Sequence, residues 1–180
     1  MQPAAPGLPE TPRAAATVVL LRDSTAGPEV LLLRRNAQAS NMAGVYVFPG
    51  GKLDADDATL SATAAGLYVA ALREALEECG LLLAEPVGGT SAVNATRARA
   101  MLREGQPFAQ VLGALQLRLQ TRQLAPWSRW VTPLAPTMGT RRFDTRFFVA
   151  QAPADQTALH DNEETTDSVW LAPRAALEPS

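Results

Sequence analysis

Residues 67–79 constrain the fold of this chain more than any other segment. As a helix, they place Glu74, Glu77 and Glu78 at positions i, i+3 and i+4, within an arc of about 100°. The opposite face is apolar and can be buried against another layer, and it consists of Tyr68, Ala71, Leu72, Ala75, Leu76 and Cys79. The sequence therefore predicts an amphipathic helix with one face in the core and one acidic face, and Gly80 is expected to end it.

The acidic face favours a bound cation. Glu74 and Glu78 repel each other at i, i+4, which costs about 0.2–0.5 kcal/mol in an isolated helix. A cation between the carboxylates would reverse that cost, and ligands that are all oxygen atoms favour Mg²⁺ or Mn²⁺ over zinc. Without further information, a solvated acidic face is the alternative interpretation.

The helix ends in a dense motif, Arg73-Glu74-Ala75-Leu76-Glu77-Glu78-Cys79-Gly80-Leu81, and Phe48-Pro49-Gly50-Gly51 lies upstream of it. Together these segments resemble the Nudix box, the signature of enzymes that hydrolyse a diphosphate linked to another moiety. The pattern ends in Arg-Glu-U-x-Glu-Glu-x-Gly-U, where U is a bulky aliphatic residue, and Ala75 is a small departure at the first U. The resemblance implies an α/β/α Nudix sandwich with a mixed β-sheet and a helical insertion.

The resemblance also implies roles for the residues of the motif. Glu74, Glu77 and Glu78 would bind Mg²⁺ or Mn²⁺, and the backbone carbonyl of Gly50 would complete the coordination. Arg73 lies at i, i+4 from Glu77 and can orient a carboxylate. These residues form the predicted catalytic and metal-binding set, in which Glu74 can also share in activating water.

A further catalytic candidate, Glu164, precedes Trp170 near the end of the chain. In several Nudix branches a glutamate from this region assists the attacking water, and a simple surface charge is the alternative. The tryptophans Trp127, Trp130 and Trp170 could stack on adenine, but we expect each of them to pack in the core.

The first half of the box is less regular than the second. Arg73 follows Gly51 by 22 positions, against 14 in the family pattern, so the spacer is eight residues longer. Counting forward from Gly51 places the first acidic residue of the pattern at Asp57, with Asp54, Asp56 or no residue at all as alternatives. Because that acidic residue is the least essential ligand in the family, we expect Asp57 to matter less than the helix glutamates.

Half of a second signature indicates the substrate. The pattern of coenzyme A-cleaving members aligns with Leu31, Leu32, Arg35, Gly44 and Phe48 to Gly51, although Leu33, Asn36 and Ser40 depart from it. The interrupted box and the helical insert resemble the acyl-CoA diphosphatase (NUDT-nineteen-like) branch. This resemblance implies cleavage of CoA or an acyl-CoA into 3′,5′-ADP and a 4′-phosphopantetheine product.

The same resemblance implies that the substrate is bound by Arg34, Arg35 and Gly51, with the two arginines supplying a cation for the 3′-phosphate of CoA. Two alternatives stay open. One is hydrolysis of another nucleoside-diphosphate derivative, such as ADP-ribose or a dinucleotide. The other is a Nudix-fold module that binds a nucleotide without turning it over.

The remaining sequence predicts one domain. Residues 1–12 carry four prolines and are expected to be a disordered tail, followed by a domain over 13–180 with a helical insert at about 86–126. Within the insert, residues 91–123 are expected to form two helices with a break near Gly105-Gln106-Pro107. Only about one helical turn follows Pro173, which leaves a truncated chain or a short natural variant as alternatives. We expect strands at about 14–22, 29–35, 45–48, 127–131, 143–150 and 167–171.

Charge and hydropathy limit the partners. A net charge of −2 gives no reason to expect nucleic acid, and no apolar run approaches the roughly 18 residues of a membrane span. The beginning of the chain lacks the features of a secretory signal, so we expect a cytoplasmic protein. The expected partner is a small nucleoside-diphosphate derivative, and the sequence leaves a homodimer open.

Overall fold

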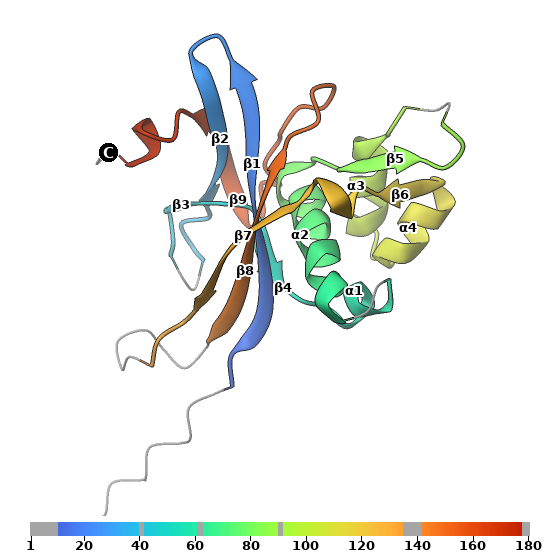
Figure 1. The fold of residues 1–180 in the computed structure, drawn as a ribbon, viewed down its shortest axis with the longest axis horizontal. Coiled ribbons are helices and arrows are strands. Elements are labelled where there is room, and N and C mark those ends of the chain that lie inside the picture. Colours follow the sequence, from blue (N-terminus) through green and yellow to red (C-terminus); the bar gives the residue numbers. More distant parts are fainter. Residues whose placement is uncertain (1–10, 40–41, 61–62, 90–91, 135–141, 178–180) are drawn as a thin grey trace, which may run out of the picture.

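The computed structural model describes residues 11–39, 42–60, 63–89, 92–134 and 142–177. Its centre is a seven-stranded sheet with the order β3-β2-β1-β8-β7, in which β4 also pairs with β1 and β9 with β2 (Figure 1). β1 is parallel to β8 and antiparallel to β2 and β4, so the predicted mixed sheet is confirmed. The strands are β1 (Arg13–Ser24), β2 (Gly27–Arg35), β3 (Tyr46–Val47), β4 (Gly50–Lys52), β7 (Ala125–Val131), β8 (Phe143–Gln151) and β9 (Thr165–Leu171).

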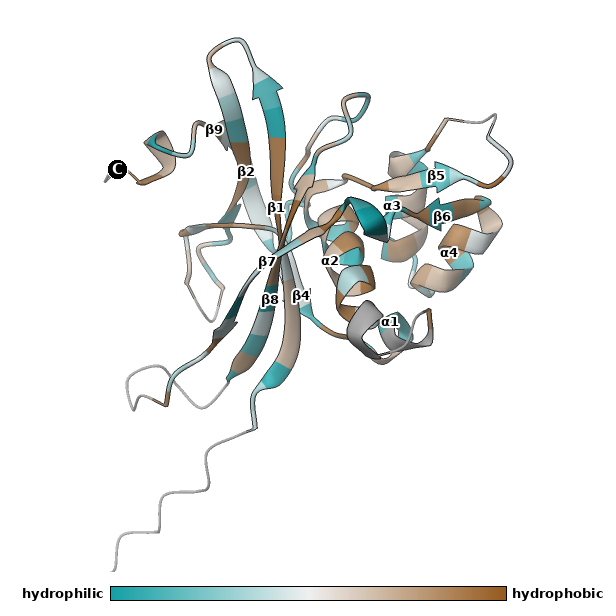
Figure 2. Cartoon of the chain, in the orientation of Figure 1, coloured by the Kyte–Doolittle hydropathy of each residue, from teal (hydrophilic) through white to brown (hydrophobic). Residues whose placement is uncertain are grey.

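Helix α2 (Thr63–Cys79) is the predicted acidic helix and covers one face of the sheet. Its apolar residues join a buried cluster with the centres of β1, β2 and β8, where Figure 2 shows hydrophobic residues in the middle of β1 and β2. Leu31 and Leu33 face α2, whereas Val30 and Leu32 pack on the opposite face of the sheet. Because side chains alternate between the two faces of a strand, Arg34 is expected on the face of Leu32 and Arg35 on the face of Leu33.

The segment after α2 forms a second layer on the outer side of that helix (Figure 1). It contains the hairpin of β5 (Ala84–Pro86) and β6 (Leu117–Leu119), with α3 (Ala95–Arg103) and α4 (Phe108–Ala114) between its strands and η1 (Thr121–Gln123) after it. Val69 and Leu76 of α2 pack against this layer. The break between the two predicted helices is confirmed, whereas the hairpin was not predicted, because each strand has only three residues.

The spacer within the box folds into α1 (Ala55–Thr59), which packs against α2. Gly80 follows α2 with φ +73°, as predicted for the residue that ends the helix, and Cys79 is buried as expected. Within the described ranges, no helix is long and apolar enough to cross a membrane.

The other face of the sheet is covered less. In the described part of the chain, the final helical element is η3 (Ala175–Leu177), whose Ala176 packs beside Val30 and Leu32. The core prediction is wrong for Trp127 and Trp130, which are 66% and 68% exposed, because β7 is the last strand of its side of the sheet. Trp170 does pack against the core, with the Arg22 guanidinium 4.4 Å from its ring centre.

Candidate functional site

The site begins where β4 passes beneath α2. The backbone N–H of Gly50 donates to a Glu78 carboxylate oxygen at 3.1 Å. A side chain at Gly51 would collide with the Glu74 carboxylate, and one at Gly50 would collide with Thr17 of β1. Gly50 is therefore required for β4 to lie against the backbone of β1, whereas a side chain at Gly51 would displace the Glu74 carboxylate.

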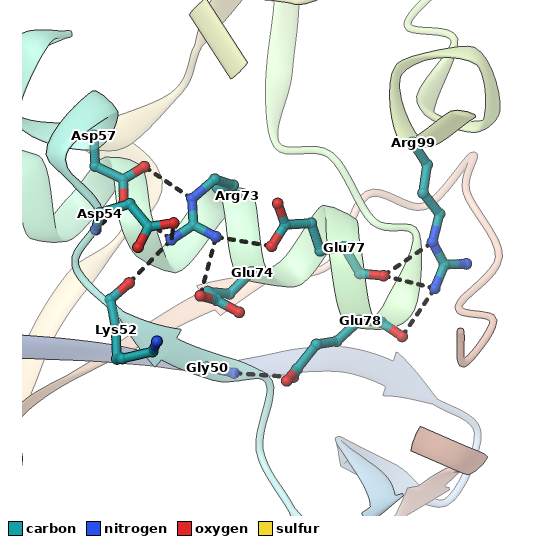
Figure 3. Close-up of polar contacts among 9 residues, drawn as sticks. All are labelled: Gly50, Lys52, Asp54, Asp57, Arg73, Glu74, Glu77, Glu78 and Arg99. Carbon is teal, nitrogen blue, oxygen red and sulfur yellow. Dashed lines mark hydrogen bonds and ion pairs between the residues drawn. The ribbon is translucent and has the colours of Figure 1, made fainter. Parts of the chain in front are cut away.

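Arg73 is the centre of the acidic network (Figure 3). Its guanidinium binds both carboxylate oxygens of Asp57, at 2.9 and 3.0 Å. It also contacts Glu77 at 2.8 Å and Glu74 at 3.0 Å, and it donates to the Lys52 carbonyl at 3.0 Å. Arg73 therefore fixes two of the three predicted metal ligands, as a fork of five donors can.

Asp57 is the acidic residue of the spacer that completes this network. Its side chain is 1% exposed and that of Arg73 is 9% exposed, so this bidentate pair is buried. Asp54 lies farther away, at 3.6 Å from Arg73, and is largely exposed. Of these two aspartates, α1 therefore places Asp57 as the bidentate partner of Arg73.

Burial and mutual repulsion shift the proton affinity of the acidic face. Burial raises the pKa of Glu74 to about 7, with Arg73 opposing this shift. Burial and the charge of Glu74 raise the pKa of Glu78 to about 8, although the Gly50 N–H opposes that shift. Burial also raises the pKa of Glu77. Burial by itself would lower the pKa of Arg73, but the hydrogen bonds to Asp57 and the charges of the nearby glutamates hold the pKa of Arg73 above its ordinary value.

The chemistry of this set fits a hard divalent cation. Among the described residues, no three His, Cys, Asp or Glu side chains are already gathered as a metal site, since Glu74 and Glu77 bind Arg73 and Glu78 binds Gly50. Glu74 is nevertheless half-buried and Glu78 is buried, their carboxylates repel each other, and carboxylate oxygens are the ligands that Mg²⁺ prefers. A cation would remove the cost of ionising both groups.

A pocket of about 400 Å³ lies between the end of β2 and the turn that carries Glu164. Arg35 and Glu164 line it, together with Asn36, Gln38, Ala39 and Glu163. The charge of Glu164 raises the pKa of both Glu74 and Glu78, and that of Arg35 lowers the pKa of Glu78, so both side chains act on the acidic face. The structure therefore places Glu164 near Glu74 and Glu78, and Arg35 near Glu78.

Arg34 is not brought to the acidic face. Leu33 and Arg34 are neighbours on β2, and Leu33 faces α2, so Arg34 points to the other side of the sheet. There it is exposed and donates to the Gly44 carbonyl at 3.3 Å. The expected arginine pair is thus divided between two faces, and only Arg35 adjoins the glutamates.

A second, smaller hollow of about 250 Å³ adjoins Glu77. Arg73 and Glu77 form one wall, and the turn between α3 and α4 forms another with Leu102, Pro107 and Phe108. The insert therefore reaches the acidic network directly. Arg99 of α3 also contacts α2, where it donates to the Glu77 carbonyl. The sequence does not single out Arg99, because no motif or spacing relates it to the box.

The raised pKa values predict an unusual pH dependence of stability in the absence of metal. Because Glu78 titrates near 8 in the folded chain instead of near 4.5, the folded state binds more protons than the unfolded state between these values. Stability without metal should therefore fall as the pH rises from about 5 to 8. Urea denaturation in EDTA at several pH values measures this effect, and Glu78→Gln should flatten the dependence. An equal slope in the variant would contradict the assignment.

Comparisons with known proteins show which family the chain resembles. The family model described as the NUDT19 Nudix domain matches residues 63–179. Acyl-coenzyme A diphosphatase NUDT19 of Xenopus laevis is 24% identical, with 87% of this chain and 56% of that protein aligned. Putative nudix hydrolase 7 of Caenorhabditis elegans is 29% identical, with 92% of this chain and 53% of that protein aligned. The chain thus spans about half the length of the curated relatives it matches.

A solved structure extends the likeness to the fold. The Nudix hydrolase from Alicyclobacillus acidocaldarius superposes with a TM-score of 0.79 at 31% identity, covering 92% of this chain and 81% of that one. This likeness confirms the predicted Nudix fold around a mixed sheet. With the family match over residues 63–179, it shows that the chain belongs to the Nudix hydrolase family, in the NUDT19 branch.

Proposed function

We propose that this chain is a Mg²⁺- or Mn²⁺-dependent pyrophosphohydrolase that cleaves the diphosphate of CoA or an acyl-CoA into 3′,5′-ADP and a 4′-phosphopantetheine product. The observation that carries the proposal is the three-glutamate face of α2, held by Arg73 and Gly50 beside a pocket. The names of the Xenopus laevis and Gallus gallus relatives, both acyl-coenzyme A diphosphatases, support the choice of substrate.

Each residue of the site has a distinct role in the proposed reaction. Glu74, Glu77 and Glu78 would hold the cation, with the Gly50 carbonyl as a further ligand, and a bound Mg²⁺ would neutralise the diphosphate oxygens and acidify water. Arg73 keeps Glu74 and Glu77 in place through its two ion pairs. Glu164, across the pocket, would orient the attacking water and accept its proton.

The preference for CoA is assigned to Arg35 and to the insert. CoA carries a 3′-phosphate and a long pantetheine arm. Dephospho-CoA lacks the 3′-phosphate, and ADP-ribose lacks both groups. The buried Nε of Arg35 has no hydrogen-bond partner among the described residues, and the side chain lines the pocket that Glu164 also lines. A charge-assisted contact of this kind is typically worth about 1.5–3 kcal/mol. The hollow with Leu102, Pro107 and Phe108 offers an apolar wall for the arm.

A substrate panel tests the proposal. With Mg²⁺ or Mn²⁺, CoA should be hydrolysed with a kcat/KM about tenfold or more above that of dephospho-CoA, and EDTA should abolish the reaction. Arg35→Ala should remove most of this gap, whereas Arg34→Ala should keep it because Arg34 lies on the other face. Mass analysis of the products identifies the bond that is cleaved.

The other outcomes of the panel point to different functions. Equal rates on CoA and dephospho-CoA, or a preference for ADP-ribose over both, would replace the CoA assignment with another nucleoside-diphosphate derivative. Recovery of every compound unchanged in the presence of metal, with binding detected by calorimetry, would instead indicate a nucleotide-binding module.

A further inference from the structure

We propose that the insert helix α3 positions the active site: Arg99 and Arg103 clamp the turn that carries Glu164 onto the C-terminal end of α2. The consequence for catalysis rests on the proposed function, whereas the clamp itself can be tested without turnover. Both arginines lie on one face of α3, four residues apart. The insert would then be a structural part of the catalytic site as well as a wall of the nearby hollow.

Arg99 joins two segments that are far apart in the sequence. Its Nε and Nη2 donate to the Glu77 carbonyl at 3.1 and 2.8 Å, and Nη2 also donates to the Glu78 carbonyl at 3.0 Å (Figure 3). Its Nη1 donates to the Leu159 carbonyl at 2.8 Å. The last carbonyls of a helix lack partners within the helix, and a cation there also complements the helix dipole. Arg99 therefore completes the end of α2 while it holds Leu159.

The turn held by Arg99 is the one that presents Glu164. The Asp161 carboxylate accepts the backbone N–H groups of Glu163, Glu164 and Thr165 at 2.8 to 3.2 Å, so this turn is built around Asp161. Arg103 donates to the Asp161 carbonyl at 3.0 Å. The clamp therefore reaches the turn at two points, Leu159 through Arg99 and Asp161 through Arg103.

Contacts independent of the arginines set the remaining sides of the turn. The Leu159 N–H donates to the Cys79 carbonyl at 2.8 Å, at the very end of α2. On the other side, the Asn36 N–H donates to the Glu164 carbonyl at 2.8 Å, which joins the turn to the end of β2. Glu164 thus stands between β2 and α2, and the α3 arginines hold the turn at the α2 side. Without them, the position of the Glu164 carboxylate relative to the α2 glutamates would be less defined.

The test combines kinetics on CoA with hydrogen exchange in the full chain. Arg99→Met keeps the aliphatic stem but removes all donors, and Arg99→Lys keeps the charge without the fork that spans both segments. Arg97→Met is the matched control, because Arg97 is exposed on the same helix. Arg99→Met should lower kcat by about 10- to 100-fold with little change in KM, and Arg99→Lys should recover part of this loss.

Two further measurements separate positioning from a general loss of structure. Backbone amides of Glu163, Glu164 and Thr165 should exchange faster in Arg99→Met than in the control, while the central amides of β1 stay protected. In a Glu164→Gln background, Arg99→Met should cost much less than in the wild type, because both changes remove the same function. If Arg99→Met does not fold, Arg103→Met supplies the same readouts, since it leaves the Arg99 contacts with α2 in place.

Unchanged exchange and near-wild-type kcat in these variants would overturn the clamp. An undiminished loss in the Glu164→Gln background would overturn its action through Glu164. If the wild-type chain cleaves no compound, the proposed function fails, and the exchange experiment with Arg97→Met as control still decides whether the clamp exists.

Discussion

Replacing Glu78 by Gln is expected to lower kcat by about 10²-fold or more while leaving the chain folded and at least as stable without metal. The activity loss follows because Gln removes a negative charge from the predicted cation ligands. Stability is kept because burial already favours the protonated carboxyl group, with a pKa of about 8, and Gln resembles that neutral form. The Gln carbonyl can still accept the Gly50 N–H, and Gln and Glu have similar helix propensities.

Glu77→Gln should cause a comparable loss of kcat but should also weaken the fold slightly, because Glu77 contacts Arg73 at 2.8 Å. Initial rates with Mg²⁺ and urea denaturation in EDTA measure the two effects separately. The exposed Glu104, at the end of α3, supplies the control Glu104→Gln, which should change neither quantity. Near-wild-type turnover in both active-site variants, with folding verified by circular dichroism, would refute the assignment of the glutamates.

Asp57→Asn is expected to have the reverse profile, with a large loss of stability and a smaller loss of activity. Asp57 and Arg73 form a buried bidentate pair, and breaking such a pair typically costs about 3–5 kcal/mol. Arg73 would still form its ion pairs with Glu74 and Glu77, so we expect the loss of unfolding free energy to lie near the lower limit of this range. That loss corresponds to a decrease in Tm of roughly 6–12 °C. Because the side-chain hydrogen bonds of Asp57 among the described residues go to Arg73 and the Asp54 N–H, and not to the glutamates, about a tenth or more of the activity should remain.

The profile of Asp57→Asn is measured by thermal denaturation and by rates at a temperature well below the Tm of the variant. Asp155→Asn, at an exposed position in the loop after β8, is the matched control. If Asp57→Asn abolishes turnover as completely as Glu77→Gln while the chain remains folded, Asp57 belongs with the catalytic glutamates. A purely structural role as the partner of Arg73 would then not explain the loss.

Local patterns in the sequence predicted the parts of the molecule whose structure depends on nearby residues. The period of apolar and acidic residues predicted α2 and its buried face, and Gly80 marked its end. The spacing of Arg73 and Glu77 by one helical turn predicted the ion pair that the structure contains. Six strands of the seven-stranded sheet were predicted from short apolar runs, with ends that differ by a few residues. β4 was not predicted, because it has only three residues and two of them are glycine.

Tertiary structure alone decided which distant groups meet. Three aspartates lie within four positions of the spacer, and only the folding of α1 against α2 selects Asp57 for Arg73. The pleat of β2, with Leu33 turned toward α2, separates Arg34 from Arg35. Packing of α3 on α2 brings Arg99 to the carbonyls of Glu77 and Glu78, more than 20 positions earlier in the chain. Helix period and strand alternation are local properties, whereas these contacts depend on how layers pack, and for that reason the sequence by itself determined the acidic face but not its partners.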